Sequence, residues 1–329
     1  MITSPAEKIL VTGAAGFIGH KVCQRLLEQG YEVIGLDNFD MYYNTALKHR
    51  RVFDLMKFKG FYLEECSINS YAMDRIFDEN YFSAVIHLAA RAGVRHSEVI
   101  PDEFVMTNVN GTFCILQQMK RRGIKKIVFA SSSSVYGDNK LPETGSHEGL
   151  PVDSIHSVYA MTKYMGERLV EKYCESNGID HTILRFFTVY GPYGRPDMFV
   201  FKAIQAFLNE RVLTVYGNGT QTRDFTYIDD IAEGVVKSLN YTTAKIINLG
   251  NTRPVSLTSI INCIEKMLSI EKNVEYVSKD SADVTTTKAD IQVANLILGW
   301  EPQVRFNEGL RRTIQWHIDN QEWLLDAGF

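Results

Sequence analysis

The chain has 329 residues, of which 45% are hydrophobic and 22% charged, with 23 Gly and 8 Pro. This composition excludes a collagen-like fibre, a small disulfide scaffold and a disordered tail protein, and the length favours about two domains or one large one. Lys and Arg number 35 and Asp and Glu 39, which gives a formal net charge of −4 without the basic stripe that a nucleic-acid-binding protein needs.

Short apolar runs alternate with helix-length segments through the first half of the chain. The runs have the length of buried parallel strands, and the alternation is the βαβ rhythm of a doubly wound sheet with helices on both faces. The predicted strands are residues 8–12, 31–36, 61–63, 84–88 and 126–130, and the predicted helices are residues 17–29, 70–80, 104–122 and 156–177.

After residue 185 the rhythm loosens, and Gly and Pro separate shorter elements. Helices are predicted at residues 256–268, 289–298 and 307–320, the second of them closed by Gly299. We therefore expect an α/β fold in which residues 1–185 form a doubly wound parallel sheet, a Rossmann fold, to which residues 224–250 return. Residues 186–223 and 251–329 are expected to form a smaller, interleaved C-terminal lobe.

The sequence Gly13-Ala-Ala-Gly16-Phe-Ile-Gly19 directly follows the first predicted strand and opens the first helix. Glycines in this context let the backbone approach a pyrophosphate, which binds at the positive N-terminus of the helix. Asp37 ends the second strand, where its carboxylate can accept hydrogen bonds from both ribose hydroxyls and would repel a 2′-phosphate. The pattern predicts an NAD site, and the strand-helix context disfavours the alternative of a structural glycine turn with a chance aspartate.

A second pattern follows the fifth predicted strand, which runs into Ser131–Ser134. Tyr159 and Lys163 are spaced i, i+4 on a predicted helix, so both can face the cleft at the carboxyl edge of the sheet. Lowering a tyrosine pKa from near 10 to near 7 takes roughly 4 kcal/mol, which a neighbouring ammonium and an oxidised nicotinamide can supply. Alone, this spacing is more typical of a packed ring and a solvated amine, but the glycine loop and the serines favour proton chemistry.

Together these motifs resemble those of the extended short-chain dehydrogenase/reductase family, the nucleotide-sugar epimerases and dehydratases, along essentially the whole chain. The shared residues are Gly13–Gly19, Asp37, His87–Ala90, Asn108, Ser132, Tyr159 with Lys163, and Arg223–Asp230. The resemblance implies a bound NAD, to which a sugar ring carbon transfers hydride. It implies that Tyr159 is the base, that Lys163 orients the ribose and lowers the tyrosine pKa, and that Ser132 binds the substrate hydroxyl.

The same resemblance implies which residues contact the cofactor. Where the family usually has an acidic residue before Ile68, this chain has Ser67, so a weaker adenine contact is expected. The implied cofactor-binding residues are Gly13, Gly16, Phe17, Ile18, Gly19, Asp37, Asn38, Ser67, Ile68, Leu88, Ala89, Ala90 and Asn108, together with Tyr159 and Lys163. The first of the two lobes is thereby the NAD-binding one and the second the nucleotide-sugar-binding one.

Within the family, the residues after Ser132 narrow the reaction. Dehydratases carry an Asp-Glu pair at the positions of Ser133 and Ser134, and UDP-glucuronate decarboxylases keep a Glu at the second, whereas serine cannot act as an acid or base near neutral pH. Residues 37–43, 92–97 and 185–198 instead resemble UDP-glucuronate 4-epimerases. We therefore expect NAD-dependent interconversion of UDP-glucuronate and UDP-galacturonate through a transient 4-keto sugar.

The resemblance also implies the substrate contacts. It places Ser133, Ser134 and Thr188 at the C5 carboxylate, where small neutral donors can hold that group out of the alignment that would release CO₂. Arg91 stands where these epimerases often carry Gln, and its contact is left open. The remaining implied substrate-binding residues are Arg95, Arg195, Phe199, Tyr216, Arg223 and Asp283, with a surface ion pair as the alternative for Arg195 and Arg223.

Other readings stay open beside this one. A UDP-hexose 4-epimerase of the glucose/galactose type or a UDP-glucuronate decarboxylase would keep the cofactor and change the substrate, and a non-catalytic NAD-binding regulatory protein is a further alternative. The eight histidines form no H-E-x-x-H motif or Cys/His cluster, so no metal is predicted, and His87 at a strand end is expected to be structural. The apolar helices 104–119 and 159–173 favour a homodimer through a four-helix bundle.

The five cysteines are widely spaced and form no C-x-x-C pair, as is typical of reduced thiols in a cytosolic protein. The N-terminal residues lack the pattern of a signal peptide, and no apolar run reaches the roughly 18 residues of a membrane span. We therefore expect a cytoplasmic chain whose partner is a UDP-sugar, with neither nucleic acid nor membrane.

Overall fold

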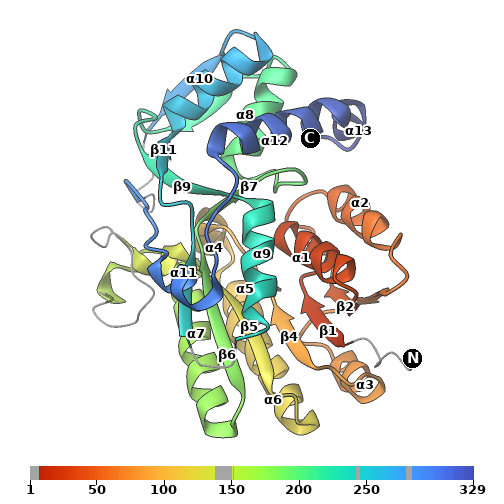
Figure 1. Cartoon of the computed structure of the whole chain (residues 1–329). Coiled ribbons are helices and arrows are strands. Elements are labelled where there is room, and N and C mark those ends of the chain that lie inside the picture. Colours follow the sequence, from red (N-terminus) through yellow and green to blue (C-terminus); the bar gives the residue numbers. More distant parts are fainter. Residues whose placement is uncertain (1–6, 138–149, 151, 242–244, 279–283) are drawn as a thin grey trace.

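The centre of the molecule is a seven-stranded parallel sheet with the strand order β10-β6-β5-β4-β1-β2-β3 (Figure 1). The structure is a computed structural model that describes residues 7–137, 150, 152–241, 245–278 and 284–329. The predicted α/β class is thus confirmed. The seven strands are β1 (Lys8–Thr12), β2 (Glu32–Asp37), β3 (Phe61–Glu65), β4 (Ala84–His87), β5 (Lys126–Ser132), β6 (Asp180–Phe186) and β10 (Lys245–Leu249).

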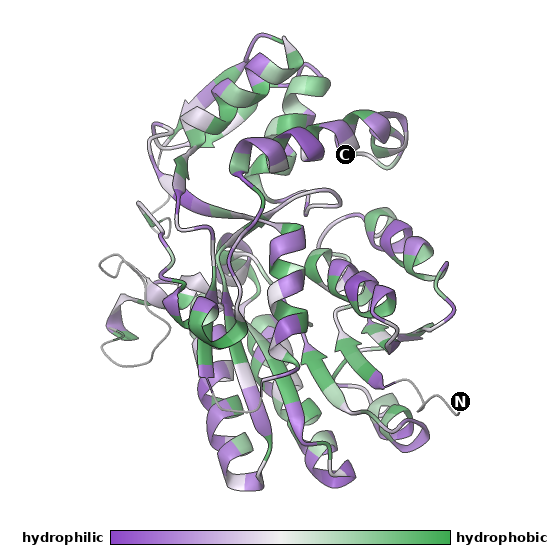
Figure 2. Ribbon diagram, viewed as in Figure 1, coloured by the Kyte–Doolittle hydropathy of each residue, from purple (hydrophilic) through white to green (hydrophobic). Residues whose placement is uncertain are grey.

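Both faces of this sheet are covered, because side chains alternate along each strand. In β1, Ile9 and Val11 join one core cluster with α1 (Phe17–Glu28) and α9 (Ile228–Ser238). Leu10, between them, joins a second cluster with helices from the opposite side. Figure 2 shows the result, with mostly green strands and helices whose purple sides turn outward. The opposite helices are α3 (Ala72–Glu79), α6 (Thr112–Arg122) and α7 (Val158–Asn177).

The C-terminal part of the chain builds a second group of elements beyond the carboxyl edge of the sheet (Figure 1). It contains a three-stranded sheet of β11 (Pro254–Ser256), β9 (Thr222–Tyr227) and β7 (Thr188–Tyr190), and a pair of β12 (Val274–Val277) and β8 (Leu213–Tyr216). Its helices are α8 (Phe199–Leu208), α10 (Leu257–Leu268), α12 (Phe306–Asp319) and α13 (Gln321–Asp326), and α11 (Gln292–Leu298) precedes α12.

The return of the chain to the central sheet is made by two elements. Helix α9 packs on α1, and β10 then adds the edge strand beside β6. Strand β9, although it lies within the expected returning segment 224–250, pairs with β7 and β11 in the second group.

The structure differs from the predicted elements in several places. The predicted helix 104–122 consists of α5 (Pro101–Val105), a π-helical segment η1 (Met106–Gly111) and α6. The helices that were not predicted include α2 (Ala46–Leu55), α4 (Val94–Val99), α8, α9 and α13. Helix α2 buries Lys48 and Arg51, so its buried face is not an apolar stripe, whereas α8 is a short, predominantly apolar segment of ten residues. Two short 3₁₀ helices, η2 (Ser133–Tyr136) and η3 (Val152–Ser154), follow β5.

Candidate active site

The site forms where the strand order reverses, at the carboxyl ends of β1 and β4, which is the usual ligand crevice of such sheets. The Thr12 hydroxyl is hydrogen-bonded to Nδ1 of His87 (2.7 Å) and accepts from the Ala89 amide (3.1 Å). Nε2 of His87 is hydrogen-bonded to Thr112 (3.1 Å). Burial, followed by the charge of Lys163, lowers the pKa of His87 to about 3, which confirms the prediction of a structural histidine.

The glycine loop closes tightly over this crevice. The amides of Gly13 and Ala14 both donate to the Leu36 carbonyl, at 2.7 and 3.1 Å. A Cβ on Gly19 would lie 2.0 Å from the Gly13 carbonyl oxygen, and a Cβ on Gly13, whose φ is +74°, would lie 2.9 Å from the Ala89 amide. Since α1 begins at Phe17, directly after the loop, the chain offers a helix N-terminus lined by bare backbone. These features fit a dinucleotide pyrophosphate.

Asp37 is fixed beside the loop at the end of β2. Its Oδ2 accepts from the Ala15 amide (3.1 Å), its Oδ1 accepts from the Phe39 amide (2.9 Å), and Lys48 Nζ lies 3.7 Å from Oδ1. The carboxylate is therefore buried and oriented, while the next residue, Asn38, is exposed. This is where the sequence places the ribose contacts.

The far wall of the crevice is built from the segments after β3 and β4. Ile68 is buried against Gly111, whose Cβ, if it had one, would meet the Ile68 side chain at 2.4 Å, and Ser67 Oγ accepts from the Asn69 amide. Asn108 exchanges two hydrogen bonds with the backbone of Arg91, at 2.8 and 3.0 Å.

The Asn108 amide also donates to Thr162 of α7 (2.9 Å). Asn108 thus holds the segment of Leu88–Ala90 against the helix that carries Tyr159 and Lys163.

The contact of Arg91, left open by the sequence, is an ion pair across the crevice. Its guanidinium donates to Asp40 at 2.6 and 3.4 Å and pairs with Glu103 of α5. Asp40 lies three residues after Asp37, so the pair joins the two walls that carry the predicted cofactor contacts.

Three predicted catalytic residues come together at the edge of β5. Tyr159 lies in the first turn of α7, where its amide donates to Ser97 Oγ of α4 (3.0 Å), and its hydroxyl is hydrogen-bonded to Ser132. Lys163, one turn on, is buried with Nζ 4.9 Å from the Phe129 ring centroid.

The electrostatics of this cluster differ from the expectation for the tyrosine. Burial raises the pKa of Tyr159, whereas the hydrogen bond with Ser132 and then the positive charge of Arg195 lower it. Asp197, which pairs with Arg195, acts in the opposite direction and raises the Tyr159 pKa. The pKa of Lys163 is itself lowered to about 8 by burial, against the opposing charge of Glu167.

A buried ion pair that the sequence analysis missed holds α7 in place. Glu167, one turn after Lys163, accepts from Arg185 of β6 at 2.8 and 2.7 Å, and both side chains are fully buried. Glu167 also accepts from Ser131 of β5 (2.5 Å). The two residues are 18 positions apart and lie on different elements, so no local pattern predicts the pair. The one indication in the sequence is that each is a charged residue among apolar ones.

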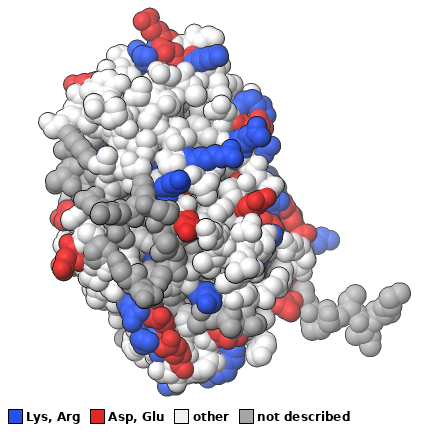
Figure 3. All heavy atoms as spheres, turned by 60° about the vertical axis from the view of Figure 1, so that its left-hand side comes forward, with Lys and Arg blue, Asp and Glu red and all other residues white. Residues whose placement is uncertain are grey.

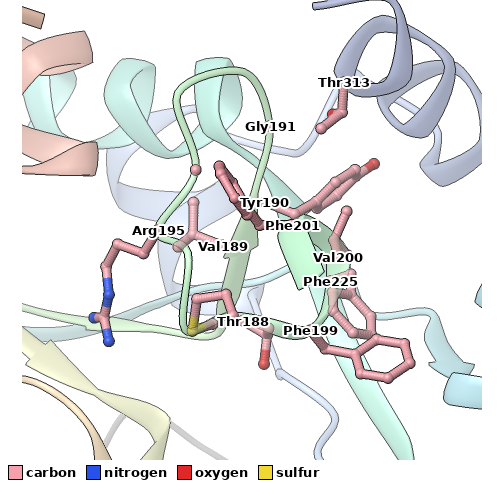
Figure 4. Close-up of a pocket in the computed structure, with 12 residues that line it drawn as sticks. Thr188, Val189, Tyr190, Gly191, Arg195, Phe199, Val200, Phe201, Phe225 and Thr313 are labelled. Atoms are coloured by element: carbon pink, nitrogen blue, oxygen red, sulfur yellow. The ribbon is translucent and has the colours of Figure 1, made fainter. Parts of the chain in front are cut away.

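At the substrate end, Thr188, Arg195 and Phe199 line one pocket between β7 and the start of α8 (Figure 4). Arg195 lies at one side of it and Phe199 at the other. Nε of Arg195 donates to Asp197 (2.9 Å), a second nitrogen pairs with the same carboxylate, and the Tyr42 hydroxyl donates to it at 3.2 Å. Burial disfavours the charge on Arg195, but Asp197 more than offsets this and raises the Arg195 pKa.

Two other predicted substrate residues meet each other. The Arg95 guanidinium of α4 lies 3.7 Å from the Tyr216 ring centroid of β8, a cation–π contact between the two groups of elements. Arg223, on β9, donates to the carbonyls of Thr222 (2.9 Å) and Thr285 (3.4 Å).

Ser133 and Ser134 follow Ser132 in η2, where the Ser134 amide donates to Ser132 Oγ (3.1 Å), so all three hydroxyls lie at the end of β5. Asp283 lies outside the described residues.

The acids of the motif Arg223–Asp230 serve the fold. Asp224 is fully buried and accepts from the amides of Asn251 (2.5 Å), Thr252 (2.8 Å) and Ala289 (3.0 Å). Asp230 accepts from the amides of residues 303 and 304 at 3.1 and 3.0 Å. These aspartates therefore join β9 and α9 to distant loops instead of facing a ligand.

The surface shown in Figure 3 carries positive and negative side chains interspersed on the face in view. Among the described residues, no group of three or more His, Cys, Asp or Glu side chains could hold a metal ion. Within the same part of the chain, no helix is long and apolar enough to cross a membrane.

A glycine loop at the switch point of a Rossmann sheet, with a serine, a tyrosine and a lysine gathered beside it, defines a nucleotide-dependent enzyme of the short-chain dehydrogenase/reductase type. The chain belongs to the NAD-dependent epimerase/dehydratase family, whose model matches residues 9–250. The resemblance drawn from the motifs is confirmed.

Three known proteins show how far this similarity extends. A UDP-glucuronate 4-epimerase of Thermodesulfobacterium geofontis is 44% identical over 315 residues, covering 95% of this chain and 97% of that protein. The crystal structure of a Bacillus cereus UDP-glucuronic acid 4-epimerase with UDP-glucuronic acid and NAD superposes with a TM-score of 0.89 at 35% identity, covering 95% and 99% of the two chains. A Thermotoga maritima UDP-glucose 4-epimerase with UDP-glucose gives a TM-score of 0.84 at 30% identity, with the same coverage.

Proposed function

We propose that this chain is an NAD-dependent UDP-glucuronate 4-epimerase, which interconverts UDP-glucuronate and UDP-galacturonate. The observation that carries the proposal is the cluster of Ser132, Tyr159 and the positive charge of Arg195, next to a row of neutral hydroxyls. The similarity to relatives of that name and to a complex with UDP-glucuronic acid and NAD supports the same substrate and cofactor.

The cofactor roles follow from the geometry. The loop of Gly13, Gly16 and Gly19 would hold the pyrophosphate, with Phe17 and Ile18 opening the helix behind it, and Asp37 would hold the ribose. The bound NAD would accept and return the hydride. Lys163, buried one turn after Tyr159, would donate to the nicotinamide ribose.

Tyr159 acts as the base at the sugar 4-hydroxyl. Burial raises the pKa of Tyr159, and the Ser132 hydrogen bond and the Arg195 charge oppose that shift by favouring the phenolate, the form that accepts the proton of the sugar hydroxyl. Ser132 can share a hydrogen bond with the same sugar oxygen. When hydride returns to the opposite face of the sugar, Tyr159 gives the proton back.

The substrate carboxylate would lie among Ser133, Ser134, Thr188 and Arg195. Hydroxyls orient a carboxylate without neutralising it, which keeps the 4-keto sugar from losing CO₂. The UDP moiety would be held by Phe199, Tyr216, Arg95, Arg223 and the segment that contains Asp283. Leu88–Ala90, with Asn108 behind them, and Asn38, Ser67 and Ile68 would complete the cofactor site.

The test is product identification. Purified protein incubated with UDP-glucuronate should form UDP-galacturonate without CO₂ release, read by chromatography and mass spectrometry. Tyr159→Phe should lower the rate by about 10²- to 10⁴-fold and retain its NAD, because it removes the base and leaves the binding surfaces. A folded, NAD-loaded protein that yields no UDP-galacturonate would contradict the proposal.

A UDP-hexose 4-epimerase is the second candidate, supported by the similarity to the UDP-glucose 4-epimerase. Turnover of UDP-glucose at a higher kcat/KM than UDP-glucuronate would favour it. Arg195 at the pocket favours the acidic substrate instead, because a guanidinium that pairs with Asp197 through Nε and one terminal nitrogen can still donate to a substrate carboxylate from the other terminal nitrogen.

We further propose a homodimer and a cytoplasmic location. Met165 of α7 is 42% exposed, and Val105 at the end of α5 and Met106 at the start of η1 are 42% and 53% exposed, so these helical segments carry apolar side chains on their outer surface. The five free cysteines suit a reducing compartment. Light scattering would give the mass of a dimer, and Met165→Glu should shift it towards the monomer.

A further inference from the structure

Arg51 of α2 is a fully buried arginine that the proposed reaction leaves without a role. One of its terminal nitrogens donates to the Ala15 carbonyl of the glycine loop (2.9 Å) and to the Tyr43 hydroxyl (2.6 Å). The other donates to the carbonyls of Tyr193 (2.7 Å) and Gly194 (3.4 Å). One guanidinium thus joins the glycine loop to the loop that precedes Arg195.

Burying a guanidinium is unfavourable unless its donors are satisfied, and a carboxylate is the usual partner. Among the described residues no carboxylate forms a salt bridge with Arg51. Its two terminal nitrogens make four hydrogen bonds to neutral oxygens, and its buried Nε has no hydrogen-bond partner there. These hydrogen bonds to the two loops offset the cost of burying the charged side chain of Arg51. The rigid planar fork is the feature that suits the site, because it can reach two loops at once.

The loop to which Arg51 donates, at Tyr193 and Gly194, has an uncommon backbone conformation. Tyr193 has a φ of +60°, which is strained for a residue with a side chain. Its ring lies against His20 of α1 and Trp316 of α12, at centroid distances of 5.0 and 4.8 Å, and its hydroxyl donates to Asp54 of α2. The strain is therefore maintained by contacts with α1 and α2 on the cofactor side and with α12 of the C-terminal group.

This conformation determines where the next side chains point. Arg195 follows Gly194 directly, its guanidinium is locked by Asp197, and its charge lowers the pKa of Tyr159. The geometry points to Arg51 as a positioning residue: it fixes Arg195 relative to the glycine loop and thereby sets the preference for an acidic over a neutral sugar nucleotide. This inference rests on the proposed function, since it names the group that makes that site selective.

The experiment compares Arg51→Lys and Arg51→Met with the matched controls Arg75→Lys and Arg75→Met. Arg75 is an exposed arginine on α3 that pairs with Glu64 and Glu79 and with neither the glycine loop nor residues 193–195. Lysine keeps the positive charge, so we expect Arg51→Lys to fold even if Arg51→Met does not. A lysine ammonium lacks the planar fork of a guanidinium, so it cannot donate to both loops at once.

Three readouts separate positioning from folding. Hydrogen exchange of the peptide spanning residues 191–198 should rise in the Arg51 variants, because the Gly194 and Met198 amides depend on that loop for their hydrogen bonds. The kcat for UDP-glucuronate should fall by about 10- to 100-fold with NAD content unchanged, as expected when a group acting on the base is displaced. The ratio of UDP-glucose to UDP-glucuronate dissociation constants should fall towards one, and the Arg75 variants should match the wild type in all three.

A folded Arg51→Lys protein with wild-type exchange and a wild-type ratio would overturn the inference, and so would a loss of kcat that leaves the ratio intact. Failure of the proposed function has a different signature. In that case the wild type forms no UDP-galacturonate, yet the exchange of residues 191–198 still reports whether Arg51 holds the loop.

Discussion

The cofactor side and the reactive side of the crevice are built in different ways. On the cofactor side, one run of residues from Gly13 to Gly19 makes its own loop, and each glycine has a backbone contact that a Cβ would destroy. On the reactive side, Ser132, Tyr159 and Arg195 come from three distant segments. Their places are set by buried charges that touch no ligand themselves.

This difference separates local from long-range specification. A tight loop is determined by backbone sterics within a few residues, so its function can be seen in a short motif. A cluster gathered from separate elements depends on pairs such as Glu167 with Arg185, which hold helix α7 against β5 and β6. Substitutions far from the ligand site should therefore disturb the reactive side more than the cofactor side.

Breaking that buried pair should produce the largest loss of stability. Glu167→Gln leaves the Arg185 charge buried and unpaired, so the free energy of unfolding should fall by about 3 to 5 kcal/mol. Denaturant unfolding measures it. The surface pair of Arg168 with Glu171 on the same helix is the control, and Glu171→Gln should lower the free energy by under about 1 kcal/mol. Equal losses in the two variants would contradict the assignment.

On the cofactor side, the corresponding change is Gly19→Ala. Its methyl group would lie 2.0 Å from the Gly13 carbonyl, so the loop must open, at a cost of about 1 to 3 kcal/mol in overpacking. We expect the purified variant to lose most of its NAD while the hydrogen bond between Ser132 and Tyr159 remains. Absorbance of the released cofactor measures this. A variant that keeps a full complement of NAD would show that the loop tolerates the methyl group.

The two sides also respond to acid through buried histidines. Burial lowers the pKa values of His20, His87 and His317 to about 3, from about 6.5 when unfolded. Between these values the unfolded chain binds more protons, so the free energy of unfolding should fall with pH below 6.5, by about 2 kcal/mol for each histidine at pH 5.

Thermal unfolding between pH 7 and pH 5 measures this dependence. His317→Gln removes one of the three titrating groups and can keep a hydrogen bond with Gln205, so it should flatten the slope. A wild-type Tm that does not change over this range would contradict the burial of neutral imidazoles.

The same contrast explains what the sequence could predict. The doubly wound parallel sheet, the glycine loop, Asp37 at the end of β2 and the approach of Tyr159 to Ser132 follow from local patterns and from the rules of such sheets. Helix α2 was not predicted because its buried face includes Arg51 and Lys48. The approach of Arg195 to Tyr159 was not predicted either, because the two residues come from separate parts of the chain. Contacts between charged residues far apart in the chain leave no periodic signal.

The smallest effect is expected at Arg91, whose ion pairs with Asp40 and Glu103 join the two walls of the cofactor crevice. Its pairs with Asp40 and Glu103 are partly exposed, so Arg91→Gln should leave folding unchanged and raise the rate of NAD dissociation by about two- to fivefold. Since exposed pairs are screened by salt, the difference from wild type should shrink as the ionic strength rises. Arg121→Gln, which removes a surface pair with Asp74, is the control and should not alter NAD release. If Arg91→Gln releases NAD at the wild-type rate in low salt, the ion pair does not help to retain the cofactor, and closure of the crevice depends on the glycine loop and Asn108 alone.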